Sequence, residues 1–449
     1  MRASPISSHA SDTPINTEMT VITAARSSNS APLKALLMTL VLGCLLILGL
    51  ANLNDVAVTT LSRLDGDIED GRPEDFLAFY VAGKFVLDGR TGDLYDPDAV
   101  EETQEALVDR PVGGAEQGLP YFNPPFLAAL LAPLATLSPS DFSVAFFIVI
   151  VLSALVGGLI ADRMLQPLST GWRVVLWFAY LSFLPMAWLL QQQQVTTFVL
   201  IGWLGFAALE SKGEHRWSGA ALAIALVKPQ SVVLILVLLL WKQRWETLRA
   251  FTIAACPLVV LSMAVGGPDI LIDYPKFLLE STRWEGRGIH PHGMFSWIGL
   301  AANLLDDTSP SLLAYLPLTT MTLSALALAW RESTWKPQSH KFHFLLAATF
   351  LTSMLTSPHF YLQDVTLICA PLTLCLSSGA VSLRKWWILA AATWLVGMYG
   401  PQLQQDHRVT LLTPWFALIL VAIYVEFWRN HKLPREVALS VHVTNKEVA

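Results

Sequence analysis

The stretch FSVAFFIVIVLSALVGGLIA, residues 142–161, contains no charged residue and is continuously apolar. About 20 such residues are needed for an α-helix to cross the hydrocarbon core of a bilayer. A transmembrane barrel strand would alternate apolar and polar residues, so this run predicts a spanning helix. The whole chain agrees, because it is 53% hydrophobic and only 14% charged, whereas soluble domains carry about 25% charged residues. The sequence therefore predicts an all-α polytopic membrane protein.

Similar runs recur along the 449 residues. About ten full crossings are predicted, near 33–53, 142–161, 172–190, 195–209, 250–266, 311–331, 342–357, 360–380, 385–400 and 409–429. Basic residues at alternate ends, among them Arg163, Arg331 and Arg429, mark the cytoplasmic side by the positive-inside rule. Both termini are then predicted inside the cell. No inverted repeat of the kind common in secondary transporters is evident.

The segments outside the spans divide the chain further. Residues 1–32, rich in Ser and Thr, are expected to be a disordered cytoplasmic tail, and 431–449 a second tail, on either side of a transmembrane domain at 33–430. The loop 54–124 is strongly acidic, with 16 Asp and Glu against 5 Lys and Arg between Asp55 and Pro124. It is expected to be extracytoplasmic, as is a second loop at 267–310.

Three segments are apolar but do not fit a simple crossing. The run 121–139 is too short between its prolines to span, so it predicts a re-entrant or interfacial helix, and 294–305 is expected to lie along the interface. The segment 217–241 is broken at its middle by VKPQ, residues 227–230, and has basic residues at both ends. Proline interrupts a helix, so a hairpin with both ends cytoplasmic is favoured over one kinked crossing.

Ionisable residues near spans are costly, and each is a functional candidate by default. The candidates are Asp75 at the start of an aromatic helix, Lys228 in the broken segment, and His359 and Asp364 in SPHFYLQD (357–364). A carboxylate can serve as general base for an attacking hydroxyl, and cationic or hydrogen-bonding groups can stabilise a phosphate leaving group. A lipid-linked substrate would explain why such residues gather at a membrane edge.

Each candidate also has a purely structural interpretation. Asp75 could cap the helix that follows it, since Asp at such a position satisfies free backbone donors. Lys228 could pair with a carboxylate or extend to the inner surface. His359 could be a hydrogen-bonded interfacial histidine with Asp364 as its partner. The glutamines at 191–194 could be polar packing at a helix end.

Several segments together resemble glycosyltransferase family 87, a family of the C superfold. They are DFLAFYVAGKFVLDGRTGDLYD (75–96), YFNPPF (121–126), QQVTTFVLIGW (193–203), GAALAIALVKPQ (219–230) and SPHFYLQD (357–364). The resemblance extends over about 33–430. It implies a C-type glycosyltransferase in the cytoplasmic membrane that moves a hexose, by default mannose, from polyprenyl phosphate to a lipid-linked or glycan acceptor on the extracytoplasmic face, with inversion.

The resemblance also assigns roles to residues. The family's catalytic Asp corresponds to Asp75, as general base, with His359 assisting at the phosphate or the acceptor. Substrate-binding positions are expected at Lys228, Gln230, Arg287, Tyr80, Tyr95, Tyr121, Asn123, Gln194 and Asp364. Lys228 and Arg287 would neutralise the phosphate, and the tyrosines with Asn123 would line the sugar pocket.

Other functions stay open. A lipid-linked glycan polymerase or ligase would also carry outer loops with Arg and His, but would not need Asp75 before this helix or the broken segment. A transporter or flippase would favour paired broken helices in two related halves. A scaffold or sensor subunit is a non-enzymatic alternative. No cofactor, metal or nucleic-acid partner is expected, and the four cysteines lie in apolar runs without metal-ligand spacing.

Overall fold

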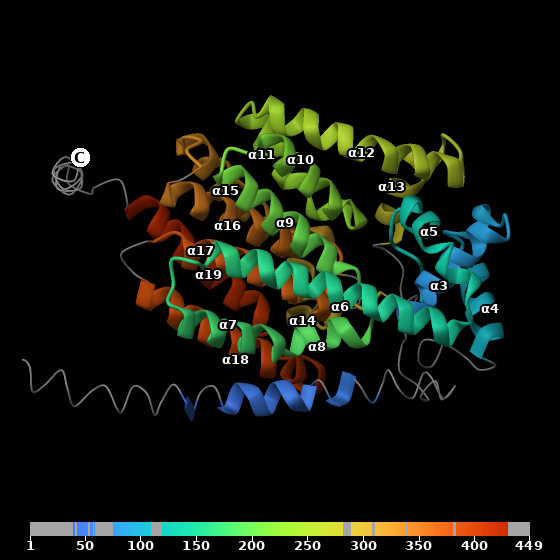
Figure 1. Ribbon diagram of the computed structural model, residues 1–449, viewed down its shortest axis with the longest axis horizontal. Helices are drawn as coiled ribbons and strands as arrows, with labels where there is room; N and C mark the ends of the chain where they lie inside the picture. The colour runs from blue at the N-terminus through green and yellow to red at the C-terminus, as the bar shows by residue number, and fades with distance from the viewer. Residues whose placement is uncertain are drawn as a thin grey trace, which may run out of the picture. The chain divides into compact units, whose positions relative to one another are not determined.

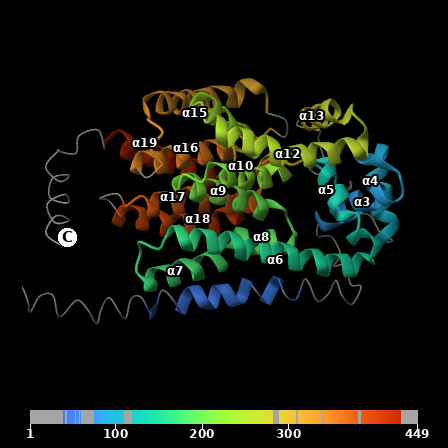
Figure 2. The same cartoon turned by 45° about the horizontal axis from the view of Figure 1, so that its top comes forward.

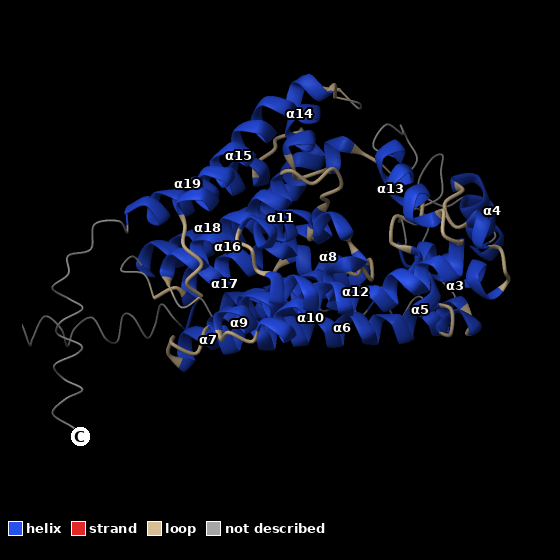
Figure 3. Cartoon of the chain, turned by 90° about the horizontal axis from the view of Figure 1, so that it is seen from above, coloured by secondary structure: helices blue, strands red, loops and turns tan. Residues whose placement is uncertain are grey.

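The computed structural model describes residues 39–40, 43–52, 54–56, 58, 75–108, 119–281, 289–307, 310–337, 339–379 and 383–429. Within these residues the secondary structure is helical and contains no strand (Figure 3). Contacts divide the chain into two units, Met1–Leu48 and Gly49–Ala449, and the described residues of the first are helical. The predicted all-helical class is confirmed for the described part of the chain. The predicted tails, 1–32 and 431–449, lie outside it.

Figure 1 labels the helices of the second unit. The α-helices are α3 (Asp75–Leu87), α4 (Pro97–Val108), α5 (Pro125–Leu131), α6 (Pro139–Met164), α7 (Thr170–Leu181), α8 (Leu184–Gln191), α9 (Thr196–Ser211), α10 (His215–Ile224), α11 (Val233–Trp241), α12 (Trp245–Gly266), α13 (Ile270–Ser281), α14 (Trp297–Leu305), α15 (Leu312–Glu332), α16 (His340–Leu355), α17 (Cys369–Ser377), α18 (Leu383–His407) and α19 (Leu412–Arg429). Short 3-10 helices are η1 (Thr91–Asp93), η2 (Leu134–Thr136), η3 (Ala225–Val227), η4 (Pro229–Ser231), η5 (Pro291–Gly293) and η6 (Leu362–Ile368).

Four described helices, α6, α12, α15 and α19, are long and apolar enough to cross a membrane. The bent pair α7 and α8 raises this number to five if the two form one span. The expected count of ten is therefore not confirmed. Helices α9 and α16 have only 16 residues each, and α18 is polar in its last turns, where the sequence reads QLQQDH.

Three expected spans differ in detail from the observed helices. Residues 172–190 form two helices that meet at an angle of 48°, with Pro185 at the start of the second. The stretch 360–380 starts as η6 and becomes α-helical only at Cys369. The helix expected at 385–400 continues to His407 and accommodates Pro401. The break before α8 follows from Pro185, because proline removes a backbone hydrogen bond and clashes with the preceding turn.

The segment 217–241 folds as a hairpin. His215 begins α10, and Arg244 follows α11 by three residues, yet the Arg244 guanidinium lies 3.0 Å from the His215 ring nitrogen. The two halves therefore leave from and return to the same place, with Lys228 at the tip between η3 and η4. The hairpin interpretation is confirmed in its geometry.

Small residues let the first half of the hairpin pack closely between two neighbours. Helices α6, α9, α10 and α12 lie side by side in that order (Figures 1 and 2). A Cβ added to Gly202 of α9 would lie 2.8 Å from the Ala225 Cβ, and one added to Gly219 of α10 would lie 2.2 Å from the Thr247 carbonyl oxygen. Such contacts between backbones are typical of membrane helix interfaces, where small residues permit close approach.

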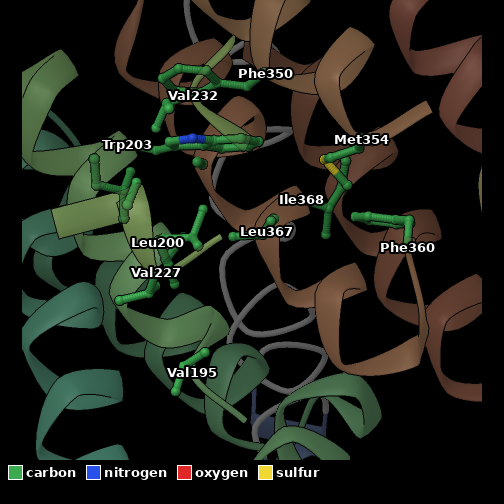
Figure 4. Close-up of a cluster of buried hydrophobic side chains, with 14 of the residues drawn as sticks. Val195, Leu200, Trp203, Val227, Val232, Phe350, Met354, Phe360, Leu367 and Ile368 are labelled. Carbon is green, nitrogen blue, oxygen red and sulfur yellow. The ribbon is translucent and has the colours of Figure 1, made fainter. Parts of the chain in front are cut away.

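The hairpin, α9 and α16 enclose a buried apolar cluster that Figure 4 shows in close-up. The Trp203 and Phe350 rings stack with centroids 4.5 Å apart, and Val195, Val227 and Leu367 belong to the same cluster. The Trp203 indole donates a hydrogen bond of 3.2 Å to the Ser231 carbonyl, just past the hairpin tip. This packing fixes the position of the hairpin tip, and therefore of Lys228, relative to α9 and α16.

Candidate functional site

A cavity of about 410 Å³ collects polar side chains from segments far apart in the sequence. Its described wall includes eight of the predicted site residues: Asp75, Tyr121, Asn123, Gln194, Lys228, Gln230, His359 and Asp364. They come from α3, the segment before α5, the turn before α9, the hairpin tip, and the segment before and within η6. The fold therefore brings together residues that the sequence separates by nearly 300 positions.

Asp75 lies in the first turn of α3 and is held by the segment that joins α8 to α9. The Gln194 side-chain amide donates a hydrogen bond to Oδ2 of Asp75. The backbone N–H of Asp75 donates to the Gln192 side-chain oxygen at 3.4 Å. The carboxylate thus has a defined orientation set by a different part of the chain.

Lys228 forms a buried ion pair with Asp364, and the two side chains are 14% and 5% exposed. The same Asp364 oxygen accepts a 2.6 Å hydrogen bond from the Thr196 hydroxyl. Its other oxygen accepts from the Tyr361 backbone N–H at 3.3 Å. Removing one partner from such a pair leaves an uncompensated buried charge, so the pair and its donors act as a unit.

His359 lies in the loop between α16 and η6, where its ring stacks on Phe122 with centroids 5.5 Å apart. Its Nε2 lies 3.5 Å from the Ser281 hydroxyl at the end of α13. Burial lowers the pKa of His359 to about 4, because the charged imidazolium would lose its hydration. At pH 7 the ring is neutral, so it offers hydrogen bonds but no positive charge.

Three of the predicted polar residues also support the cavity wall. The Asn123 amide donates 3.0 Å to the Val227 carbonyl at the hairpin tip. The Tyr95 hydroxyl donates 2.9 Å to the Asn123 carbonyl, and the Tyr121 hydroxyl donates 3.0 Å to the Pro124 carbonyl. Burial raises the pKa of both tyrosines, so they remain neutral donors. The segment before α5 is thereby tied to the hairpin.

Two predicted substrate-binding residues, Tyr80 and Tyr95, do not line the cavity. Tyr80 donates its hydroxyl to the Leu137 carbonyl at 3.2 Å and packs on Phe142. Tyr95 stacks on Tyr121 and supports the wall from behind. Arg287 lies outside the described residues.

Several lining residues were not singled out from the sequence. They are Trp188, Tyr361, Gln404 and Gln405. Tyr361 lies inside the quoted segment SPHFYLQD (357–364), so its position beside Asp364 was the available signal. The pair at the end of α18 had none, because only the unexpected continuation of that helix past Pro401 carries it to the cavity. Gln404 fixes the adjoining loop by donating to the carbonyls of His292 and Met294 at 2.6 and 3.1 Å.

The described residues contain no group of three or more His, Cys, Asp or Glu side chains that could hold a metal ion. A second, smaller cavity of about 120 Å³ lies among α6, α7, α9, α17 and α18. Its wall is almost entirely apolar, with the Asp162–Arg173 pair at one end. Of the side chains that line these two cavities, most of those able to donate, accept or transfer a proton belong to the larger one.

Comparison with known proteins gives one match. The model of the family described as Glycosyltransferase family 87 matches residues 121–358, which include Tyr121, Asn123, Gln194, Lys228 and Gln230 but neither Asp75 nor His359. No curated protein and no solved structure matches the chain. The matched region covers more than half of the 449 residues and contains the hairpin and the glutamine turn. The chain belongs to glycosyltransferase family 87 and is a membrane glycosyltransferase.

Proposed function

We propose that the protein transfers a hexose, by default mannose, from polyprenyl phosphate to a lipid-linked or glycan acceptor. The observation that carries the proposal is the single cavity shared by Asp75, the Lys228–Asp364 pair and neutral His359. A carboxylate, an ammonium and a neutral hydrogen-bonding ring are the groups that glycosyl transfer from a phosphate requires. The cavity would face the outside of the cytoplasmic membrane, in a C-type fold of about ten crossings with both termini inside.

The proposed reaction is a single displacement with inversion. The acceptor oxygen attacks the anomeric carbon, and the bond from that carbon to the phosphate oxygen breaks. Asp75 takes the proton of the acceptor hydroxyl, and the electron pair of the broken bond leaves on the phosphate. A β-linked donor then gives an α-linked product.

Lys228 is proposed to receive the phosphate, with Gln230 beside it at the hairpin tip. Lys228 has Asp364 as its partner, so phosphate binding would add a second anion to an existing ion pair. Arg287 is proposed as a further cation, since the described wall holds two carboxylates and one ammonium. His359, neutral at pH 7, would hydrogen-bond to the leaving phosphate or to the acceptor.

The test is transfer from radiolabelled polyprenyl-phosphate-mannose in membrane vesicles, comparing the wild-type chain with Asp75→Asn. The amide cannot accept the proton, so activity should fall by at least about 100-fold, the low end of general acid–base contributions. Asp88→Asn is the matched control, because Asp88 follows the same helix but pairs with Lys84 on the surface, away from the cavity. Its activity should match the wild type.

Equal activity of Asp75→Asn and wild type would remove Asp75 as the base and direct attention to Asp364. Absence of transfer by the wild type with mannose, glucose and galactose donors alike would reject polyprenyl-phosphate hexoses as substrates. A lipid-linked glycan polymerase or ligase is the second candidate function, favoured if a preassembled oligosaccharide is transferred instead. A transporter would favour paired broken helices of like form in two related halves, whereas the described chain combines the α10–α11 hairpin with a 48° bend between α7 and α8.

A further inference from the structure

One five-residue segment, Gln192–Thr196, touches both of the ionic groups proposed for the reaction. It connects α8 to α9, and we name it the QQQVT turn after its sequence. Gln194 was expected from the sequence to bind substrate, yet its side-chain amide is directed at Asp75. Gln192 also contacts Asp75, and Thr196 contacts Asp364.

Gln192 and Gln194 of the QQQVT turn each form a hydrogen bond with Asp75. Gln194 donates to the carboxylate, and Gln192 accepts from the backbone N–H of the same residue. One contact orients the side chain and the other fixes the start of α3. A glutamine amide that donates to a carboxylate also favours its ionised form, which is the form that a general base needs.

The middle of the turn is anchored away from the cavity. Gln193 is fully buried and donates a 2.7 Å hydrogen bond to the Ser143 hydroxyl on α6. Its φ of +54° lies in the left-handed region, which a residue with a side chain occupies at a cost in energy. Such strain persists where surrounding contacts determine the backbone, and it is concentrated at functional sites. Because the backbone changes direction at Gln193, the side chains of Gln192 and Gln194 both reach Asp75.

Thr196, the last residue of the turn, binds the Lys228–Asp364 ion pair. Thr196 donates to the Asp364 oxygen that also binds Lys228, and Thr196 is completely buried. Gln194, which binds the proposed base, is therefore only two positions from Thr196, which binds the Asp364 partner of the proposed phosphate-binding lysine. Val195, between them, is packed in the apolar cluster and is also completely buried.

We infer that the QQQVT turn is a positioning element that fixes the proposed base relative to the proposed phosphate-binding lysine. This inference rests on the proposed function for the roles of Asp75 and Lys228. It changes the role of Gln194 from substrate ligand to positioning residue and adds Gln192 and Thr196. A misplacement of about 1 Å between reacting groups can cost about a hundredfold in rate, so rigidity between these two residues has a direct catalytic value.

The chain offers a matched pair for the test, Thr196→Val and Thr197→Val. Both threonines are fully buried in the first turn of α9, and each donates or shares one hydroxyl hydrogen bond. The Thr197 hydroxyl lies 2.6 Å from that of Ser153 on α6, away from the cavity, whereas the Thr196 hydroxyl is bound to Asp364. Each variant removes one buried hydroxyl hydrogen bond, so both should lose stability, and Thr196→Val should lose more because its acceptor is a carboxylate.

Function should separate the two variants. Thr196→Val should raise the KM for the prenyl-phosphate donor, and the Kd for a short-chain prenyl phosphate, about tenfold, which is the effect of one hydrogen bond to a charged group. Thr197→Val should leave both within about twofold of wild type. Gln194→Leu should instead lower kcat about tenfold to a hundredfold and shift the acid limb of the pH–rate profile to higher pH, with prenyl-phosphate affinity unchanged.

Equal effects of Thr196→Val and Thr197→Val on donor affinity would overturn the inference. It would also be overturned if Gln194→Leu weakened prenyl-phosphate binding while kcat stayed at the wild-type value. Binding of the prenyl phosphate is measured separately from transfer, by equilibrium dialysis of a radiolabelled short-chain prenyl phosphate against the purified chain. A wild-type chain that binds but does not transfer would reject the proposed reaction, while the comparison of the two threonine variants would still decide the inference.

Discussion

The two ends of the α10–α11 hairpin both carry buried ion pairs, but in different surroundings. At the base, Glu210 is completely buried and accepts hydrogen bonds from Arg244 at 3.2 Å, Thr247 at 3.1 Å and the Trp335 indole at 3.1 Å. His215 lies 3.0 Å from the same carboxylate. At the tip, Asp364 holds Lys228 at the wall of the cavity.

The difference indicates which pair serves folding and which serves chemistry. The base pair does not line the cavity, and its carboxylate accepts hydrogen bonds from the start of α12 and from the segment after α15, an arrangement that closes the hairpin against α9 and α12. The tip pair borders a space large enough for a ligand, so the lysine can exchange part of its bonding with an incoming anion. A substitution at the base should therefore reduce stability, and one at the tip should reduce activity.

The largest expected effect on stability is at the base. Arg244→Met leaves the Glu210 carboxylate buried with less compensating charge, which should cost about 3 kcal/mol of unfolding free energy. Denaturant unfolding in detergent measures this loss. Arg216→Met is the control, because the Arg216–Glu246 pair lies at the same end of α10 with an 86% exposed arginine, and surface pairs contribute little. Equal losses in both variants would contradict the assignment of the base as a structural clamp.

At the tip, Lys228→Met should reduce transfer by about a hundredfold or more, since a cation at a leaving phosphate supplies a large share of transition-state stabilisation. Lys228→Arg should retain part of the activity, because the charge remains although its shape differs. Activity is measured per folded molecule, after comparison of the unfolding transitions. If Lys228→Met transfers sugar at the wild-type rate while Arg244→Met is inactive, the roles of tip and base are reversed.

A smaller effect, dependent on pH, is expected beside the tip at His359. Its pKa is about 4 in the folded chain and about 6.5 when unfolded, so the unfolded state binds the proton first as pH falls. The stabilisation is complete above about pH 6.5 and is lost progressively toward pH 4. Between pH 7 and pH 5 the loss should be about 2 kcal/mol.

His359→Gln should remove this component, because glutamine does not titrate, and the two stability curves should converge at low pH. Unfolding of wild type and variant at pH 7 and pH 5 gives the comparison. Parallel curves over this interval would mean that His359 is not held neutral by burial. The base of the hairpin provides the internal reference, since Arg244→Met should shift stability at both pH values.

Much of the helical framework could be predicted from the sequence, because apolar runs and prolines are local signals. The run at 142–161 became α6, and the prediction of a hairpin followed from basic residues at both ends of 217–241 with a proline between them. The clustering of Asp75, Lys228, His359 and Asp364 was also expected, since each interrupts or borders an apolar stretch.

The pairing within the site could not be predicted. Asp364 was considered a partner for His359, but it binds Lys228 and Thr196. Gln194 was expected to contact substrate, and its hydrogen bond to Asp75 had no signal in the sequence. These contacts join residues more than 100 positions apart, and no local pattern encodes which of several polar neighbours will meet.

The return of the hairpin has a topological consequence. Because residues 215–244 start and end at the same place, they do not add a membrane crossing. The end of α9 and the start of α12 therefore lie on the same side of the membrane, as they would if a short loop joined them. The turns on either side of the hairpin are alike, with positive φ at Gly213 and Gln243. An accessibility tag inserted at either turn should therefore be detected from the same side of the membrane.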